Sequence, residues 1–71
     1  MTHASIINRW PSLSEFAEDL SIAYGTAKAM RRRGSIPPLY WSVVIRKAEE
    51  RDIEGVTLET LVSAVAGEVA A

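Results

Sequence analysis

Apolar residues along the chain recur at intervals of three and four positions, the spacing that gathers side chains on one face of a helix. Proline and glycine interrupt this pattern and divide the chain into five apolar segments. These segments predict helices at about residues 4–10, 13–20, 24–33, 38–52 and 57–67. The β-branched run at residues 43–45 is short and lies inside a helical pattern, so we expect no strand there. The predicted fold class is an all-α, single domain of five short helices.

The first predicted helix ends at a proline. Ile6, Ile7 and Trp10 share one of its faces. Pro11 stops the helix because proline disfavours helical geometry in the preceding residue and has no amide hydrogen to donate. We interpret Trp10 as a core side chain, with a base-stacking platform as the alternative. His3 precedes this helix, in a terminus that we expect to fray.

The second and third predicted helices are joined by a tight turn at Ser21 and Ile22. Ser12 and Glu15 stand three residues apart, as in a capping box, where each side chain accepts a hydrogen bond from the other residue's backbone amide. Gly34 closes the third helix as a left-handed C-cap. The apolar face of the second helix consists of Leu13, Phe16, Ala17 and Leu20, and its outward acids are Glu15, Glu18 and Asp19.

The third predicted helix begins at Tyr24, and Ala27 and Met30 then recur every third residue on its inward face. Gly25 stands near its start, although glycine is a poor helix former. We interpret this glycine as a position that permits the close approach of protein or nucleic acid.

An extended connector leads from Gly34 to Pro38, which is well placed as the first residue of the next helix. The apolar face of that helix consists of Trp41, Val44, Ile45 and Ala48. Thr57 is expected to cap the last helix. The apolar stripe of the last helix consists of Leu58, Leu61, Val62 and Val65.

Cationic residues concentrate in the middle of the chain, although the formal net charge is only −1. Residues 21–48 carry six Lys and Arg side chains and no acid. Residues 1–20 carry one arginine against three acids, and residues 49–71 carry one arginine against six. A basic middle between acidic ends indicates local contact with a polyanion. The alternative, that these cations only complement helix dipoles, does not account for six of them without one acid.

Length and composition narrow the class of protein. With 71 residues the chain is one small domain, and without cysteine it has no disulfide or thiolate metal ligand. One histidine and scattered carboxylates do not suggest a metal site, and no nucleophile set, phosphate loop or deep pocket is indicated. We therefore expect no enzyme, no metal, no cofactor and no small-molecule substrate.

Nothing in the sequence indicates a membrane partner. No apolar run approaches the roughly 18 residues that cross a bilayer. The N-terminal residues lack the basic-then-apolar order of a signal peptide. We expect the protein in the cytoplasm, associated with the nucleoid.

The two central helices carry a recognisable spacing: a small residue in the first helix, a tight turn four residues later, and buried apolar residues in the second. These positions are Ala17, Ser21, Ile22, Ala27 and Met30. With the tail Arg-Arg-Arg-Gly-Ser-Ile-Pro-Pro at residues 31–38, the pattern resembles the helix-turn-helix of the lambda-repressor/Cro-like family of phage and bacterial transcription regulators. The family commonly has glycine at the turn, and its recognition helix often carries Gln or Asn for adenine, which this helix lacks.

The resemblance implies a recognition helix that enters the major groove of DNA with its N-terminal residues toward the bases. The base-contacting candidates that it implies are Tyr24, Gly25, Thr26 and Lys28. The phosphate-contacting candidates are Ser12, Ser14, Arg31, Arg32 and Arg33. Of the three arginines, Arg31 is the one expected to reach deepest.

Some of these assignments have a plainer alternative. Tyr24 is alternatively a surface aromatic that packs on the turn, and Lys28 a solvated helix residue. The arginine run is alternatively plain solvated surface. Arg46 and Lys47 are expected to be mainly solvent-facing.

The function that the resemblance implies is sequence-specific binding of double-stranded DNA by a transcription regulator. Family members usually bind as two-fold dimers, and the segment 57–69 is the candidate dimer surface; its alternative role is a fifth helix that completes the core. A different function remains open, namely an adaptor with the same fold that contacts RNA polymerase or another regulator without binding DNA.

Overall fold

Five α-helices and one short 3₁₀ helix make up the regular structure of the computed structural model, which describes the backbone of residues 2–70 and the side chains of residues 2–65. The elements are α1 (His3–Ile7), α2 (Leu13–Leu20), α3 (Tyr24–Arg33), η1 (Pro38–Tyr40), α4 (Trp41–Glu50) and α5 (Leu58–Ala70). No strand occurs in the described residues. The predicted all-α class with five helices is confirmed.

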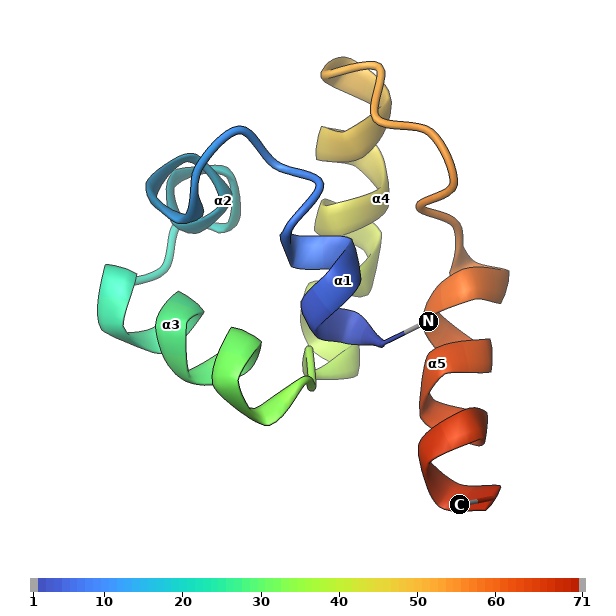
Figure 1. The fold of residues 1–71 in the computed structure, drawn as a ribbon. Coiled ribbons are helices and arrows are strands. Elements are labelled where there is room, and N and C mark those ends of the chain that lie inside the picture. The colour runs from blue at the N-terminus through green and yellow to red at the C-terminus, as the bar shows by residue number, and fades with distance from the viewer. Residues whose placement is uncertain (1, 71) are drawn as a thin grey trace.

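The helices pack around a shared centre (Figure 1). In this view α3 and α5 lie on opposite sides of the molecule, with α1 and α4 between them. Helix α2 packs against both α3 and α4, and α1 contacts both α3 and α5. The radius of gyration is 11.1 Å, which matches the about 11 Å expected for a folded domain of this length. The chain is therefore a compact globule.

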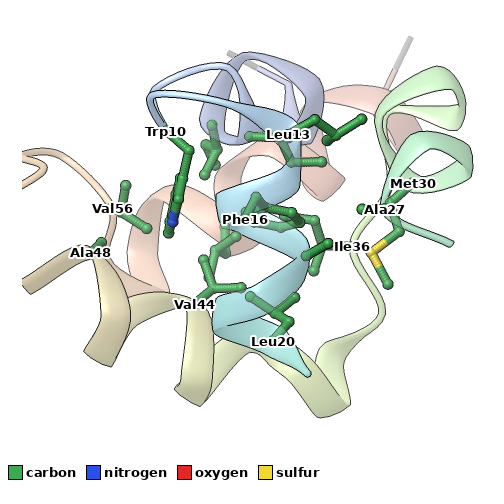
Figure 2. Close-up of a cluster of buried hydrophobic side chains, with 14 residues drawn as sticks. Trp10, Leu13, Phe16, Leu20, Ala27, Met30, Ile36, Val44, Ala48 and Val56 are labelled. Atoms are coloured by element: carbon green, nitrogen blue, oxygen red, sulfur yellow. The ribbon is translucent and has the colours of Figure 1, made fainter. Parts of the chain in front are cut away.

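Phe16 lies at the centre of the core, on the inward face of α2 (Figure 2). All four residues expected on that face are buried, which confirms the helical periodicity that predicted them. Trp10 is buried as well, and its ring meets the Phe16 ring edge-on, with 5.0 Å between centroids. The interpretation of Trp10 as a core side chain is confirmed.

The turn between α2 and α3 consists of residues 21–23, with Ser21 in the left-handed conformation at a φ of 56°. The amide of Ile22 donates to the Ala17 carbonyl (3.0 Å), which closes the end of α2. Gly34 closes α3 in the same conformation, at a φ of 67°, as expected. The turn at Ser21 reverses the chain immediately after α2, so α3 packs against α2 instead of continuing away from it.

The cap of α2 forms only in part as predicted. The amide of Glu15 donates to the Ser12 hydroxyl (3.2 Å). The Glu15 carboxylate, however, accepts from the Ser12 hydroxyl and from Arg51 instead of the Ser12 amide. The expected reciprocal box is wrong for α2 because a distant arginine attracts the carboxylate.

Three helix boundaries differ from the prediction. Helix α1 ends at Ile7, and the amides of Arg9 and Trp10 donate within tight turns that bring the indole into the core. The segment predicted as 38–52 begins as the 3₁₀ helix η1, and α4 ends at Glu50, before Asp52 adopts a positive φ of 57°. Helix α5 extends to Ala70 rather than to residue 67.

The apolar stripe predicted for α5 is only partly buried. Leu61 lies in the core, and Ala64, which the prediction left out, is buried beside it. Leu58 and Val62 are 59% and 48% exposed. Thr57 caps the helix as expected, because its hydroxyl accepts from the Thr60 amide (3.1 Å). Over residues 58–65, whose side chains the structure describes, helix α5 thus buries Leu61 and Ala64 and leaves Leu58 and Val62 largely in solvent.

The expectation that His3 lies in a fraying terminus is wrong. Its side chain is only 1% exposed and lies edge-on to the Trp41 ring. The Ile36 amide donates to its Nδ1 (2.7 Å), and its Nε2 lies 3.0 Å from the Leu61 carbonyl oxygen. These partners assign the ring as neutral, with the hydrogen on Nε2. His3 therefore joins α1, the connector after α3, and α5.

Candidate functional site

Helix α3 touches the core along a narrow line and exposes the rest of its surface. Its buried residues are Ala27 and Met30. The side chains exposed on it include all of the predicted contact residues of the helix, namely Tyr24, Gly25, Thr26, Lys28, Arg31, Arg32 and Arg33. Tyr24 is 52% exposed, so the core does not use its ring. The structure thus brings these residues together on one outward helix.

The cationic side chains of α3 have no carboxylate partner within the described residues. The four ion pairs found there all involve cations of α4 or the residue after it. Arg46 and Lys47 both approach Glu50, at 3.9 and 3.6 Å. The positive charge of the central segment is therefore compensated on α4 and uncompensated on α3.

Arg51 binds two of the three acids of α2, Glu15 and Asp19. It donates to both carboxylate oxygens of Asp19 (2.6 and 3.2 Å), and the Trp10 indole also donates to Asp19 (2.9 Å). The hydrogen bond from Arg51 lowers the pKa of Asp19. Partial burial raises this pKa, but the hydrogen bond from Trp10 lowers it further, and the net shift is downward. The hydrogen bond that Arg51 donates to Asp19 raises the pKa of Arg51. The prediction that Glu15 and Asp19 simply point outward is wrong, since Arg51 holds both on the α4 side.

The N-terminus of α2 lies beside α3 across a polar hollow of about 210 Å³. The hollow is lined by Ile7, Asn8, Trp10, Pro11, Ser12, Leu13 and Arg31. The hydroxyl of Ser12 is engaged in capping its own helix, whereas Ser14 is exposed. Of the two predicted serines, Ser14 is thus the one with a hydroxyl open to an outside partner.

A second hollow of about 290 Å³ lies on the other flank of α3 and is more apolar. It is lined by Thr26, Ala29, Met30, Arg33, Ser35, Pro37, Leu39 and Tyr40. Leu39 is 73% exposed at its rim. Sequence reasoning missed both Asn8 and Leu39 as neighbours of α3, because neither belongs to an apolar stripe or a charge run.

The start of α3 is open to an approaching molecule. No side chain caps it within the described residues, and its first turn carries no acid. A methyl group added at Gly25 would meet no atom within 4 Å, so nothing inside the protein requires a glycine there. Gly55 differs, because its φ is +80° and the Arg9 guanidinium fills the space beside it. The glycine of α3 is therefore free of an internal role.

The described residues form neither a metal site nor a membrane-spanning helix. Histidine, cysteine and carboxylate side chains nowhere gather there in a group of three that would hold a metal ion. Among the described helices, none combines the length and the apolar character needed to cross a membrane.

Comparisons of the chain with known protein families, with curated proteins and with solved structures return no match. Statements about its function therefore depend on its own residues and their geometry.

Proposed function

We propose that the protein is a transcription regulator that binds double-stranded DNA with α3 in the major groove. One observation supports this above all: α3 is exposed and carries four cations with no carboxylate partner in the described residues. Phosphates of DNA supply the missing negative charge, and each phosphate neutralised releases counterions.

The dimensions of α3 suit this role. A helix with its side chains is about 10–12 Å wide, close to the about 12 Å width of the major groove. The absent side chain at Gly25 lets the backbone of the first turn come close to base edges. In this position Tyr24, Thr26 and Lys28 face the bases, and the positive end of the helix dipole points toward the DNA.

Phosphate contacts would come from two elements. Arg31 lies across the polar hollow from the N-terminus of α2, where Ser14 offers its hydroxyl and the first backbone amides of the helix point outward. Arg33 lies on the opposite flank of α3. A cation on each flank allows the helix to contact both walls of the groove, which positions it without reading sequence.

A second copy of the chain would provide the area that one small domain lacks. Helix α5, which lies on the side of the molecule opposite α3 in Figure 1, carries the exposed residues Leu58 and Val62. We expect Val62→Glu to shift the protein toward monomer in sedimentation equilibrium, because it replaces one of these apolar side chains with a charge. Ser63→Glu, which adds the same charge at an exposed neighbouring position, should leave the association constant unchanged. Equal effects of both variants would contradict an α5 dimer.

Fluorescence anisotropy with a labelled random duplex tests the proposed function. The parent protein should bind, and its affinity should fall steeply between 50 and 200 mM salt, on the order of 10²-fold or more for several phosphate contacts. The double variant Arg31→Ala/Arg33→Ala should bind much more weakly with a shallower salt slope. Arg46→Ala/Lys47→Ala loses the same charge from α4 and should resemble the parent. Absence of binding at 50 mM salt, or equal losses in both double variants, would overturn the proposal.

A second function is favoured by the apolar hollow beside Leu39. An adaptor that contacts RNA polymerase or another regulator would use such a surface, since exposed apolar side chains next to charge mark protein contacts. Leu39→Ser separates the two functions. It should abolish binding to a protein partner, and it should leave salt-dependent binding to random DNA within about twofold of the parent if DNA is the ligand.

A further inference from the structure

Three consecutive arginines at the end of α3 cannot act alike, because successive helix residues differ by about 100° around the axis. The buried side of α3 lies midway between Ala27 and Met30. Measured from this midpoint by helix geometry, Arg31 lies about 70° to one side and Arg33 about 90° to the other. Arg32 lies about 170° away, on the outermost line of the helix. The three side chains therefore point toward different parts of any groove that α3 enters.

The neighbours of Arg31 and Arg33 agree with flank positions. Arg31 lines the polar hollow with Asn8 and Ser12, and Arg33 lines the apolar hollow with Leu39. Arg32 lines neither of these hollows, and it is exposed. Its side chain is thus exposed and lies away from both of these hollows.

Lys28 precedes Arg32 by one helical turn, so the two share a ridge. Gly25 stands beside this ridge on the outer arc, and Ala29 borders the apolar hollow; both are too short to reach a partner. Lys28 and Arg32 are consequently the two side chains that extend furthest from the outer arc of α3. Their backbone positions lie about 6 Å apart along the helix, which spans roughly two base steps of DNA.

The chemistry of this ridge selects among the bases. Both side chains only donate hydrogen bonds. Guanine offers two acceptors, O6 and N7, in the major groove, whereas cytosine offers a donor there and adenine pairs best with an amide side chain. Helix α3 contains no carboxylate, asparagine or glutamine. Thymine offers a single acceptor, O4, beside its methyl group. Guanine, with two acceptors and no donor, is therefore the base edge that best matches a ridge of donors.

From this geometry we infer that Lys28 and Arg32 read guanines through O6 and N7, about two base steps apart, while Arg31 and Arg33 hold phosphates on either side. The inference rests on the proposed function and assigns its specificity to one arginine of the three.

Single substitutions Arg31→Ala, Arg32→Ala and Arg33→Ala provide the test, because each removes one exposed cation and the three serve as charge-matched controls for one another. Duplexes would first be selected from a random pool with the parent protein. The affinity ratio between the best selected duplex and random DNA would then be measured at one salt concentration. Arg32→Ala should lower this ratio about tenfold or more, whereas the other two should weaken both duplexes equally. Replacing the guanine assigned to Arg32 with 7-deazaguanine should weaken binding by the parent and leave binding by Arg32→Ala unchanged.

The outcomes separate the inference from the proposed function. If the parent binds DNA but all three variants keep the same ratio, or Arg31→Ala alone loses it, the assignment to Arg32 is overturned and DNA binding stands. If selected duplexes lack guanine, the choice of base is overturned. If the parent shows no salt-dependent binding to any duplex, both the proposed function and the inference fall.

Discussion

Four cationic side chains lie on α3 and three lie on or just after α4, but only the second group has carboxylate partners in the described part of the chain. On α4, Arg46 and Lys47 form ion pairs with Glu50. Arg51, just after α4, forms an ion pair with Asp19 and so links the end of α4 to α2. Residues of the same type therefore stabilise the fold in one region and remain available in the other. Changes on the α4 side should alter folding, and changes on the outer face of α3 should alter binding.

The largest expected effect comes from the core that supports both regions. Phe16→Ala removes a fully buried ring between α2 and its neighbours and should destabilise the domain by about 3–5 kcal/mol, enough to unfold much of it. Urea unfolding followed by circular dichroism measures this loss. Ser14→Ala, on the exposed face of the same helix, should change stability little. A Phe16→Ala protein as stable as the parent would show that α2 does not organise the core.

The buried histidine should give the next largest effect. His3→Phe keeps an aromatic ring but leaves the buried Ile36 amide without its acceptor, at about 1–3 kcal/mol, and removes the side-chain contact to the Leu61 carbonyl. His3→Gln offers both an acceptor and a donor and should recover part of the loss. Thermal unfolding of the three proteins tests this, and a His3→Phe variant that melts with the parent would contradict the bridging role.

The Arg51 contact makes stability depend on pH. The pKa of Asp19 is lowered from its ordinary value of 3.8 by the hydrogen bond from Arg51. The folded state therefore favours the ionised carboxylate, and this contribution is complete above about pH 5 and lost as pH falls through the folded pKa. Asp19→Asn should be less stable than the parent at pH 7, and the difference should shrink toward pH 3.

Glu18→Gln is the matched control for this prediction, because it removes one carboxylate from the exposed face of the same helix. Its stability difference from the parent should be small at pH 7. If Asp19→Asn and Glu18→Gln give the same pH profile in urea unfolding, Arg51 does not stabilise the fold through Asp19.

The substitution with the smallest expected effect on folding, Gly25→Ala, distinguishes most clearly between a residue used for binding and one used for stability. Gly25→Ala should stabilise the protein by up to about 1 kcal/mol, since alanine favours helix and the new methyl meets no atom of the chain. The same change should weaken DNA binding. Gly55→Ala should instead destabilise the fold, because of the positive φ and the Arg9 guanidinium. A Gly25→Ala protein that gains stability and keeps full affinity would show that nothing approaches this face closely.

Local signals predicted the central helices well. The bounds of α2 and α3 agree with the structure because Ser12 caps one and Gly34 ends the other, and both are short-range effects. The predicted end of the first helix was too late, because the turns after Ile7 serve the burial of Trp10 rather than any local preference. Hydrophobic periodicity thus located the helix, but the end of so short a helix depends on long-range packing.

Long-range partners account for the other errors. His3 finds its partners 33 and 58 residues away, and no spacing in the sequence indicates them. Asp19 lies off the apolar stripe of α2, so the pattern predicted an outward side chain. In the structure it accepts a hydrogen bond from Arg51, which follows α4 and lies 32 residues away in sequence. Counting charges by segment also placed Arg46 and Lys47 with the cations of α3, although Glu50 compensates them. For the candidate site, the sequence named residues of a helix that the structure shows to be largely exposed. Its flanks and outer arc are defined only once Ala27 and Met30 are known to be its buried residues.

Amide chemical shifts during a titration with duplex DNA test the central claim most directly. In two-dimensional NMR spectra of the full chain, the signals of Gly25, Lys28 and Arg32 should move most, together with those at the start of α2. Signals of Arg46 and Lys47 should stay in place. Shifts confined to α4, α5 or the surroundings of Leu39, or no shifts at low salt, would contradict the account.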